Sequence, residues 1–112
     1  MKTELKINGI YSYSFGDAEN TYIIILKKRN QNSYYLYVLD CLNEYSNNEI
    51  QERLINDISN NLIKLSFFIE ADFTRHSKKY ITEYIDGYLG LCDEKICEKL
   101  RNYYTTYMEF IH

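Results

Sequence analysis

The chain has 112 residues, of which 46% are hydrophobic and 26% are charged, and its net charge is −3. This length fits one domain, residues 1–112, and the hydrophobic content excludes an intrinsically disordered chain. The longest uninterrupted apolar stretch, residues 22–26, is far too short to span a bilayer, and no apolar run follows the charged N-terminus. The sequence therefore predicts a cytoplasmic protein with no membrane partner. The three cysteines lack zinc-ligand spacing, so we expect packed, reduced thiols and neither a metal nor a cofactor.

The first half of the chain predicts strands. Residues 5–15 are expected to form a strand, because Tyr11, Tyr13 and Phe15 alternate with serines. Residues 21–29 and 33–42 are rich in β-branched and aromatic side chains, and a short Asn-rich loop joins them. This pattern indicates a β-hairpin. The second strand of the hairpin is apolar on both faces, which is typical of a central strand.

The second half mixes helices and strands. A short helix is expected near residues 49–58, where apolar residues recur every four positions, with Asn47 or Asn48 as its cap. A further strand is expected at residues 62–69.

Residues 78–85 fit either a helix or a strand, and we favour a strand. Gly87 and Gly90 then indicate a break. Asp93 is expected to cap a terminal helix near residues 93–110.

These elements predict an α+β fold. We expect a small, strongly bent antiparallel sheet, closed or nearly closed like an SH3 barrel, with a short helix and a C-terminal helix. Tyrosines on both faces of the strand expected at 33–42 and along the terminal helix exceed what so small a core hides, so the sequence also predicts a homodimer.

The densest polar segment, residues 70–79, follows the strand expected at 62–69. RNA is cleaved without metal when a base takes the 2′-hydroxyl proton and a cation stabilises the phosphorane. Asp72 or His76 is the candidate base, and Arg75 is the candidate phosphate ligand. The composition by itself fits a solvated charged connection better, and no complete catalytic motif is present in the chain.

Four segments in chain order resemble a known family. They are a Gly-aliphatic-aromatic opening at residues 9–15, an aliphatic strand at 20–26, an Ala-Asp-x-x-Arg exit at 71–75, and a Leu-Gly-x-x-x-Glu entry to the terminal helix at 89–94. Together they resemble the MazF/PemK family of toxin endoribonucleases. The resemblance implies a dimeric SH3-like barrel that cleaves single-stranded RNA and is blocked by an antitoxin's acidic tail.

The chain also departs from this family. Asn20 and Thr21 stand where the family has Arg-Pro, so its active-site arginine is missing. The family's threonine at the end of the third strand is replaced around residues 40–42. The resemblance carries Asp72 and Arg75 over, although an alignment through residues 77–79 puts Thr74 on that arginine.

Two functions therefore stay open, and whether the chain is an enzyme depends on which holds. The first is metal-independent cleavage of single-stranded RNA. The second is a non-catalytic barrel of the same ancestry that binds a protein, as a degenerate toxin or an inhibitor. For either function, Tyr11, Tyr13, Lys78 and Lys79 are the expected RNA- or partner-binding residues. The basic hairpin tip at residues 27–29 is expected to be an ordinary solvated loop, where charge reversal has little effect.

Overall fold

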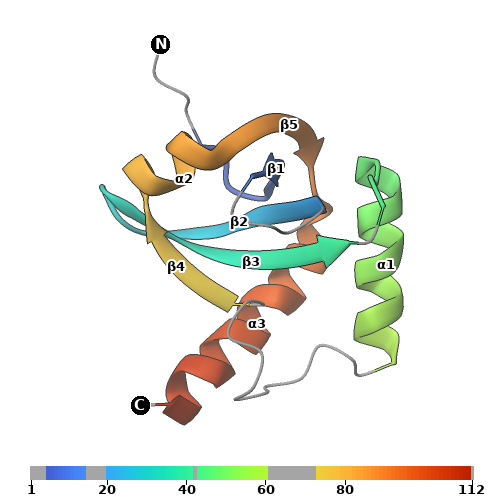
Figure 1. Ribbon diagram of the computed structural model, residues 1–112. Helices are drawn as coiled ribbons and strands as arrows, with labels where there is room; N and C mark the ends of the chain where they lie inside the picture. Colours follow the sequence, from blue (N-terminus) through green and yellow to red (C-terminus); the bar gives the residue numbers. More distant parts are fainter. Residues whose placement is uncertain (1–4, 15–19, 42, 61–72, 112) are drawn as a thin grey trace.

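The computed structural model describes residues 5–14, 20–41, 43–60 and 73–111, with backbone only for residues 73–76 and 104–111 (Figure 1). Five strands and three helices lie within these ranges. In chain order they are β1 (Gly9–Tyr13), β2 (Asn20–Asn30), β3 (Ser33–Cys41), α1 (Asn47–Ser59), β4 (Phe73–Ser77), α2 (Lys78–Tyr84), β5 (Ile85–Leu91) and α3 (Glu94–Ile111).

The five strands form one antiparallel sheet in the order β4-β3-β2-β1-β5. The chain runs from β1 to β4 as a meander, and β5 then returns to the free side of β1. Strands β4 and β5 are the two edges, and α2 connects them directly (Figure 1). The expected α+β class and the hairpin are confirmed, and β3 is central as predicted.

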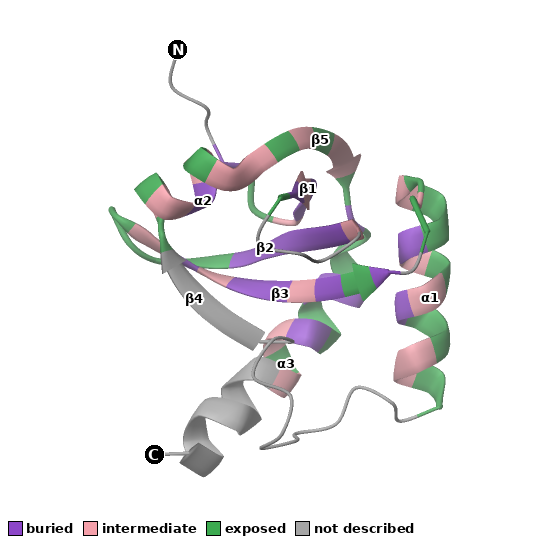
Figure 2. Ribbon diagram, in the orientation of Figure 1, coloured by how far each residue is buried: buried purple, intermediate pink, exposed green. Residues whose placement is uncertain are grey.

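Both faces of the sheet are buried (Figure 2). On one face, Ile24 and Leu39 pack against Leu54 of α1 and Leu100 of α3. A buried layer on each face explains why β2 contains an unbroken apolar run from residue 22 to 26. The other face holds a second cluster in which side chains of β1, β2 and β3 pack around Ile81 of α2.

Helix α1 begins with a capping box. The Ser46 side chain accepts a hydrogen bond from the Glu49 backbone N–H, and the Glu49 carboxylate accepts one from the Ser46 backbone N–H. Ser46, one residue before the expected asparagines, is therefore the N-cap. Asp93 caps α3 as predicted, because its Oδ1 accepts a hydrogen bond of 2.8 Å from the Lys95 backbone N–H.

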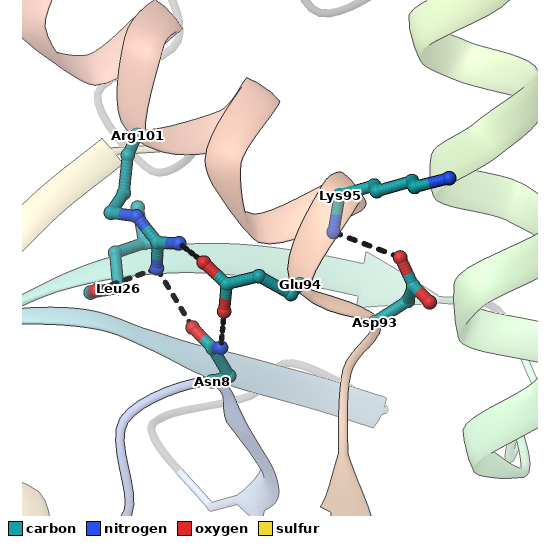
Figure 3. A network of polar contacts seen from close by, with 6 residues as sticks. All are labelled: Asn8, Leu26, Asp93, Glu94, Lys95 and Arg101. Atoms are coloured by element: carbon teal, nitrogen blue, oxygen red, sulfur yellow. Dashed lines mark hydrogen bonds and ion pairs between the residues drawn. The ribbon is translucent and has the colours of Figure 1, made fainter.

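Arg101 ties α3 to the sheet (Figure 3). Its guanidinium donates to Asn8 Oδ1 over 2.7 Å and to the Leu26 carbonyl over 3.1 Å, and it pairs with Glu94. Leu26 lies at a register shift between β2 and β3, where the ladder of backbone hydrogen bonds is disrupted. Arg101 thus donates a hydrogen bond to the carbonyl of a buried residue, and buried backbone carbonyls need such a partner.

Two expectations about residues 78–90 are wrong. Residues 78–84 form α2 instead of a strand, because the Ser77 side chain caps it by accepting from the Tyr80 backbone N–H. Gly87 and Gly90 do not break the chain but lie within β5, where they pair with Ser12 and Ile10 of β1. The strand expected at residues 62–69 lies outside the described residues, as does Phe15. No helix in the described part of the chain is long and apolar enough to cross a membrane.

Candidate nucleic-acid interface

The fold brings two basic segments of the sequence to the same end of the sheet. The β2–β3 hairpin tip lies beside the junction of β4 and α2, where the Lys78 backbone N–H donates to the Asn32 carbonyl over 2.6 Å and Ser33 pairs with Ser77. The sequence does not predict this proximity, which comes from the pairing of β3 with β4. We call their six basic residues the basic end: Lys27, Lys28, Arg29, Arg75, Lys78 and Lys79.

Charge is strongly segregated between the basic end and the rest of the chain. Residues 27–35 and 73–79 hold six basic side chains, one histidine and no acidic side chain. The other 96 residues hold seven basic and sixteen acidic side chains, a net charge of −9. A basic surface on an acidic protein directs an anionic partner to one place, because the acidic remainder of the surface repels the anion.

Two tyrosines of β3 lie between the basic strands. Tyr35 pairs with Lys27 of β2 on one side and with Arg75 of β4 on the other, and the Lys27 Nζ lies 5.1 Å from the centre of the Tyr35 ring. Tyr34 pairs in the same way with Lys28 and His76. Cationic groups interleaved with aromatic rings are typical of surfaces that bind single-stranded nucleic acid.

The exposure of these side chains differs along the strands. Lys27, Lys28 and Arg29 are exposed, as is Lys79, and Lys78 is half-buried. Tyr35 is half-buried beneath Lys27, whereas Tyr34 belongs to the core cluster around Ile81. The charges of the hairpin tip and of α2 are therefore accessible to an anion.

The predicted catalytic residues are placed only in part. Arg75 and His76 occupy consecutive positions of β4, and consecutive strand positions belong to opposite faces of a sheet. Asp72 lies outside the described residues. The register thus brings Arg75 to the row of Lys27 and Tyr35, and the joint action of Asp72, Arg75 and His76 stays a prediction.

The predicted binding tyrosines lie in the core. Tyr11 is 2% exposed and Tyr13 is 8% exposed, and both belong to the cluster around Ile81. Burial raises the pKa of both phenols, so they stay protonated at neutral pH. Of the four predicted binding residues, Lys78 and Lys79 are the pair that the structure places at the basic end.

The far ends of β2 and β3 hold the positions where the chain departs from the MazF/PemK pattern. Asn20 pairs with Cys41 and Thr21 with Asp40. Arg53 of α1 reaches this place, and its Nη1 donates to the Asp40 carbonyl over 3.1 Å and lies 3.5 Å from Cys41 Sγ.

These contacts do not make Cys41 a nucleophile. Burial raises the pKa of its thiol, and the neighbouring Arg53 only partly offsets this effect. The Arg53 guanidinium is also paired with Asp57 over 3.6 Å. The thiol therefore stays protonated at neutral pH, which agrees with its predicted role as a packed residue.

The sequence did not point to Tyr35, nor to the proximity of the hairpin tip and α2. The signal that finds them is the absence of acidic residues from two segments about 40 residues apart. Comparison with known proteins adds nothing to these geometric findings, because no protein family, curated protein or solved structure matches the chain.

Proposed function

We propose that the chain is a divergent MazF/PemK-like protein that binds single-stranded RNA through its basic end and cleaves it without a metal. The basic end is the observation that carries this proposal. Six basic groups gather there around the half-buried Tyr35, with no acidic residue in the contributing segments, although the chain as a whole is acidic. A cytoplasmic location belongs to the proposal, and the three free cysteines suit a reducing compartment.

A nearly closed SH3-like barrel is the fold proposed for this function. In a flat sheet the edge strands β4 and β5 would lie about 19 Å apart, at about 4.8 Å between neighbouring strands. Helix α2 joins them with seven residues, which span only about 10 Å at 1.5 Å per residue. The sheet therefore has to curl so that its edges approach each other. The cluster around Ile81, which would be the barrel interior, supports this interpretation.

Binding is tested with a labelled, unstructured RNA by fluorescence anisotropy at several salt concentrations. If all six basic groups meet phosphates, the logarithm of the association constant should fall against the logarithm of salt concentration with a slope of about −4. Replacing Lys27 and Lys28 together by glutamine should reduce this slope by about 1.4 and weaken binding. Replacing Lys78 and Lys79 should have a similar effect.

The matched control replaces Lys95 and Lys99 by glutamine. Both are exposed lysines of α3, so this variant has the same change in net charge at a site away from the basic end. Its affinity should stay close to that of the wild type. An equal loss of affinity in the control would show that net charge alone, and no localised interface, binds the RNA.

Cleavage is the second half of the proposal. Arg75 pairs with Tyr35, beside Lys27, so it lies where a bound phosphate would be surrounded by cations. Arg75→Ala should lower the cleavage rate by about 100-fold, as expected for a lost charge-stabilising group. His76→Ala tests the proposed base separately. Chromatographic analysis of products from a panel of single-stranded RNAs measures both, and binding without any cleavage would reject this half.

A second candidate function is a non-catalytic barrel that binds a protein, such as an antitoxin or another partner. The ends of β2 and β3 favour it. Asn20 and Cys41 pair where the resembled family has catalytic residues, and the nearby Arg53 is already engaged by Asp57 and the Asp40 carbonyl. Affinity purification tests this function. Recovery of a stoichiometric protein partner, in a preparation without ribonuclease activity, would support it over RNA cleavage.

A homodimer is proposed with either function. The tyrosines of β3 give it little support, because Tyr34 and Tyr37 are buried within one chain. Support comes instead from the β5 edge, where Tyr88 is 46% exposed and Leu91 is 57% exposed. An edge strand with exposed apolar side chains is a common surface for pairing with a second chain. Light scattering at micromolar concentration should give twice the mass of the chain.

A further inference from the structure

A polar groove of about 490 Å³ lies at the opposite end of β2 from the basic end. Its walls are the ends of β1 and β2 near residues 12–14 and 20–22, the segment 44–47 before α1, and two residues of β5. Volumes of 300–1,000 Å³ are typical of small-molecule sites.

The two β5 residues reach the groove through irregularities in the sheet. Strand β5 has two register shifts against β1, and they leave Asp86 and Leu89 without a paired residue in β1. These two are the β5 residues that line the groove. Bulges often occur beside binding sites. The extra residue changes the direction of a side chain, so that it points where regular strand pairing would not place it.

Hydrogen bonds fix the remaining wall in place. The Tyr45 backbone N–H donates to the Tyr22 hydroxyl over 2.7 Å, which holds the segment before α1 against β2. The Asn47 side chain donates to the Leu89 carbonyl over 3.2 Å and to the Leu91 carbonyl over 3.3 Å, which holds it against β5. The groove is thus formed before any ligand binds.

The chemistry of the lining favours a cation. Two exposed carboxylates, Glu44 and Asp86, and the half-buried Tyr45 line the groove, and no lysine, arginine or histidine is among the described residues that line it. Carboxylates and aromatic rings together stabilise ammonium and guanidinium groups. The positive end of α1 is nearby, and its capping box engages the backbone N–H groups of Ser46 and Glu49.

We propose that this groove binds an aliphatic organic cation, through an ammonium or guanidinium group held by Glu44 and Asp86. The proposal does not depend on RNA binding. Two sources carry this chemistry: a free amine, and an arginine or lysine side chain on a peptide. They are distinguished by titrating the protein separately with agmatine and with a blocked Gly-Arg-Gly peptide, following backbone amide shifts by NMR.

Saturable shifts at residues 44–47 and 86–89 are expected with at least one of these probes. Asp86→Asn should weaken binding about tenfold, the loss expected for one charge-assisted hydrogen bond. Because Asp86 also bonds the Ser14 hydroxyl, Glu44→Gln serves as a second variant at an exposed position and should weaken binding as well. Tighter binding of agmatine would indicate a free amine, and tighter binding of the peptide would indicate a side chain.

Two controls keep the proposal open to rejection. A peptide with citrulline in place of arginine has nearly the same shape without the charge, so it should not bind. Glu98→Gln removes one exposed carboxylate from α3 and should leave the affinity unchanged. The absence of shifts with both cations, equal binding of the citrulline peptide, or an equal loss in Glu98→Gln would each overturn the proposal.

Discussion

Replacement of Arg101 by methionine should destabilise the fold more than any single surface change on α3. The Arg101 side chain is 24% exposed and donates hydrogen bonds to Asn8 Oδ1, to the Glu94 carboxylate and to the carbonyl of Leu26, a residue that is 1% exposed (Figure 3). Methionine keeps most of the apolar stem but donates nothing. The Leu26 carbonyl is then left without this donor at a disrupted position of the β2–β3 ladder.

The magnitude follows from these contacts. A hydrogen bond from a charged donor contributes about 1.5–3 kcal/mol, and an unsatisfied buried carbonyl costs about 1–3 kcal/mol. The pair with Glu94 adds little, because Glu94 is 66% exposed and exposed ion pairs contribute about 0–1 kcal/mol. We therefore expect Arg101→Met to lower the free energy of unfolding by about 2–4 kcal/mol. For a domain of this size, this corresponds to a fall in Tm of roughly 10 °C.

Chemical denaturation followed by circular dichroism measures this change. Lys99→Met is the matched control, since it makes the same kind of replacement at an exposed position of α3 and should shift stability by less than about 0.5 kcal/mol. Glu94→Gln separates the ion pair from the carbonyl contact and should cost less than about 1 kcal/mol. If Arg101→Met stays within about 0.5 kcal/mol of the wild type, the guanidinium does not hold Leu26 in place.

Two further predictions concern local structure. Gly9→Ala should destabilise the protein by about 1–3 kcal/mol. The new Cβ would lie 2.8 Å from Tyr11 Cε2 and 2.9 Å from the Lys6 carbonyl oxygen. Gly87→Ala is the control in the same denaturation assay and should have a much smaller effect, because its Cβ would lie 3.4 Å from its nearest neighbour. Hydrogen bonds from the N-cap lower the pKa of Glu49, so the folded state favours its carboxylate. That stabilisation is present above the unfolded pKa near 4.5 and is lost as the pH falls through the lower folded pKa. Glu49→Gln should therefore remove part of the acid-induced loss of stability, as measured by Tm against pH.

The local elements could largely be read from the sequence. The hairpin follows from two β-branched and aromatic runs around an Asn-rich loop, and both amphipathic helices follow from their apolar period and, for α3, from Asp93. The spacing of Ile81 and Ile85 fits both periods, so the pattern could not decide residues 78–84. The structure shows that the Ser77 cap and the burial of Ile81 favour a helix there.

The candidate sites could not be predicted in the same way. The basic end depends on the pairing of Tyr35 with Arg75, residues 40 positions apart, and no local pattern reports that register. The groove depends on two bulges in β5 that place Asp86 and Leu89 on it. Bulges arise from the match between two strands, so the sequence of β5 by itself shows only two glycines in an apolar run.

The basic end and the polar groove should act independently, because β2 separates them. Thr21 lines the groove and Lys28 belongs to the basic end, and seven strand residues span about 23 Å. The Debye length at physiological salt is about 8 Å, so a charge bound at one site is largely screened at the other. The affinity for RNA measured with the blocked Gly-Arg-Gly peptide, a univalent cation, should therefore equal that measured in potassium chloride of the same ionic strength. Asp86→Asn should likewise leave RNA binding unchanged. A lower affinity for RNA in the peptide than in the potassium chloride control, together with a loss of RNA affinity in Asp86→Asn, would mean that both ligands use one surface. The assignment of the two sites to opposite ends of β2 would then be wrong.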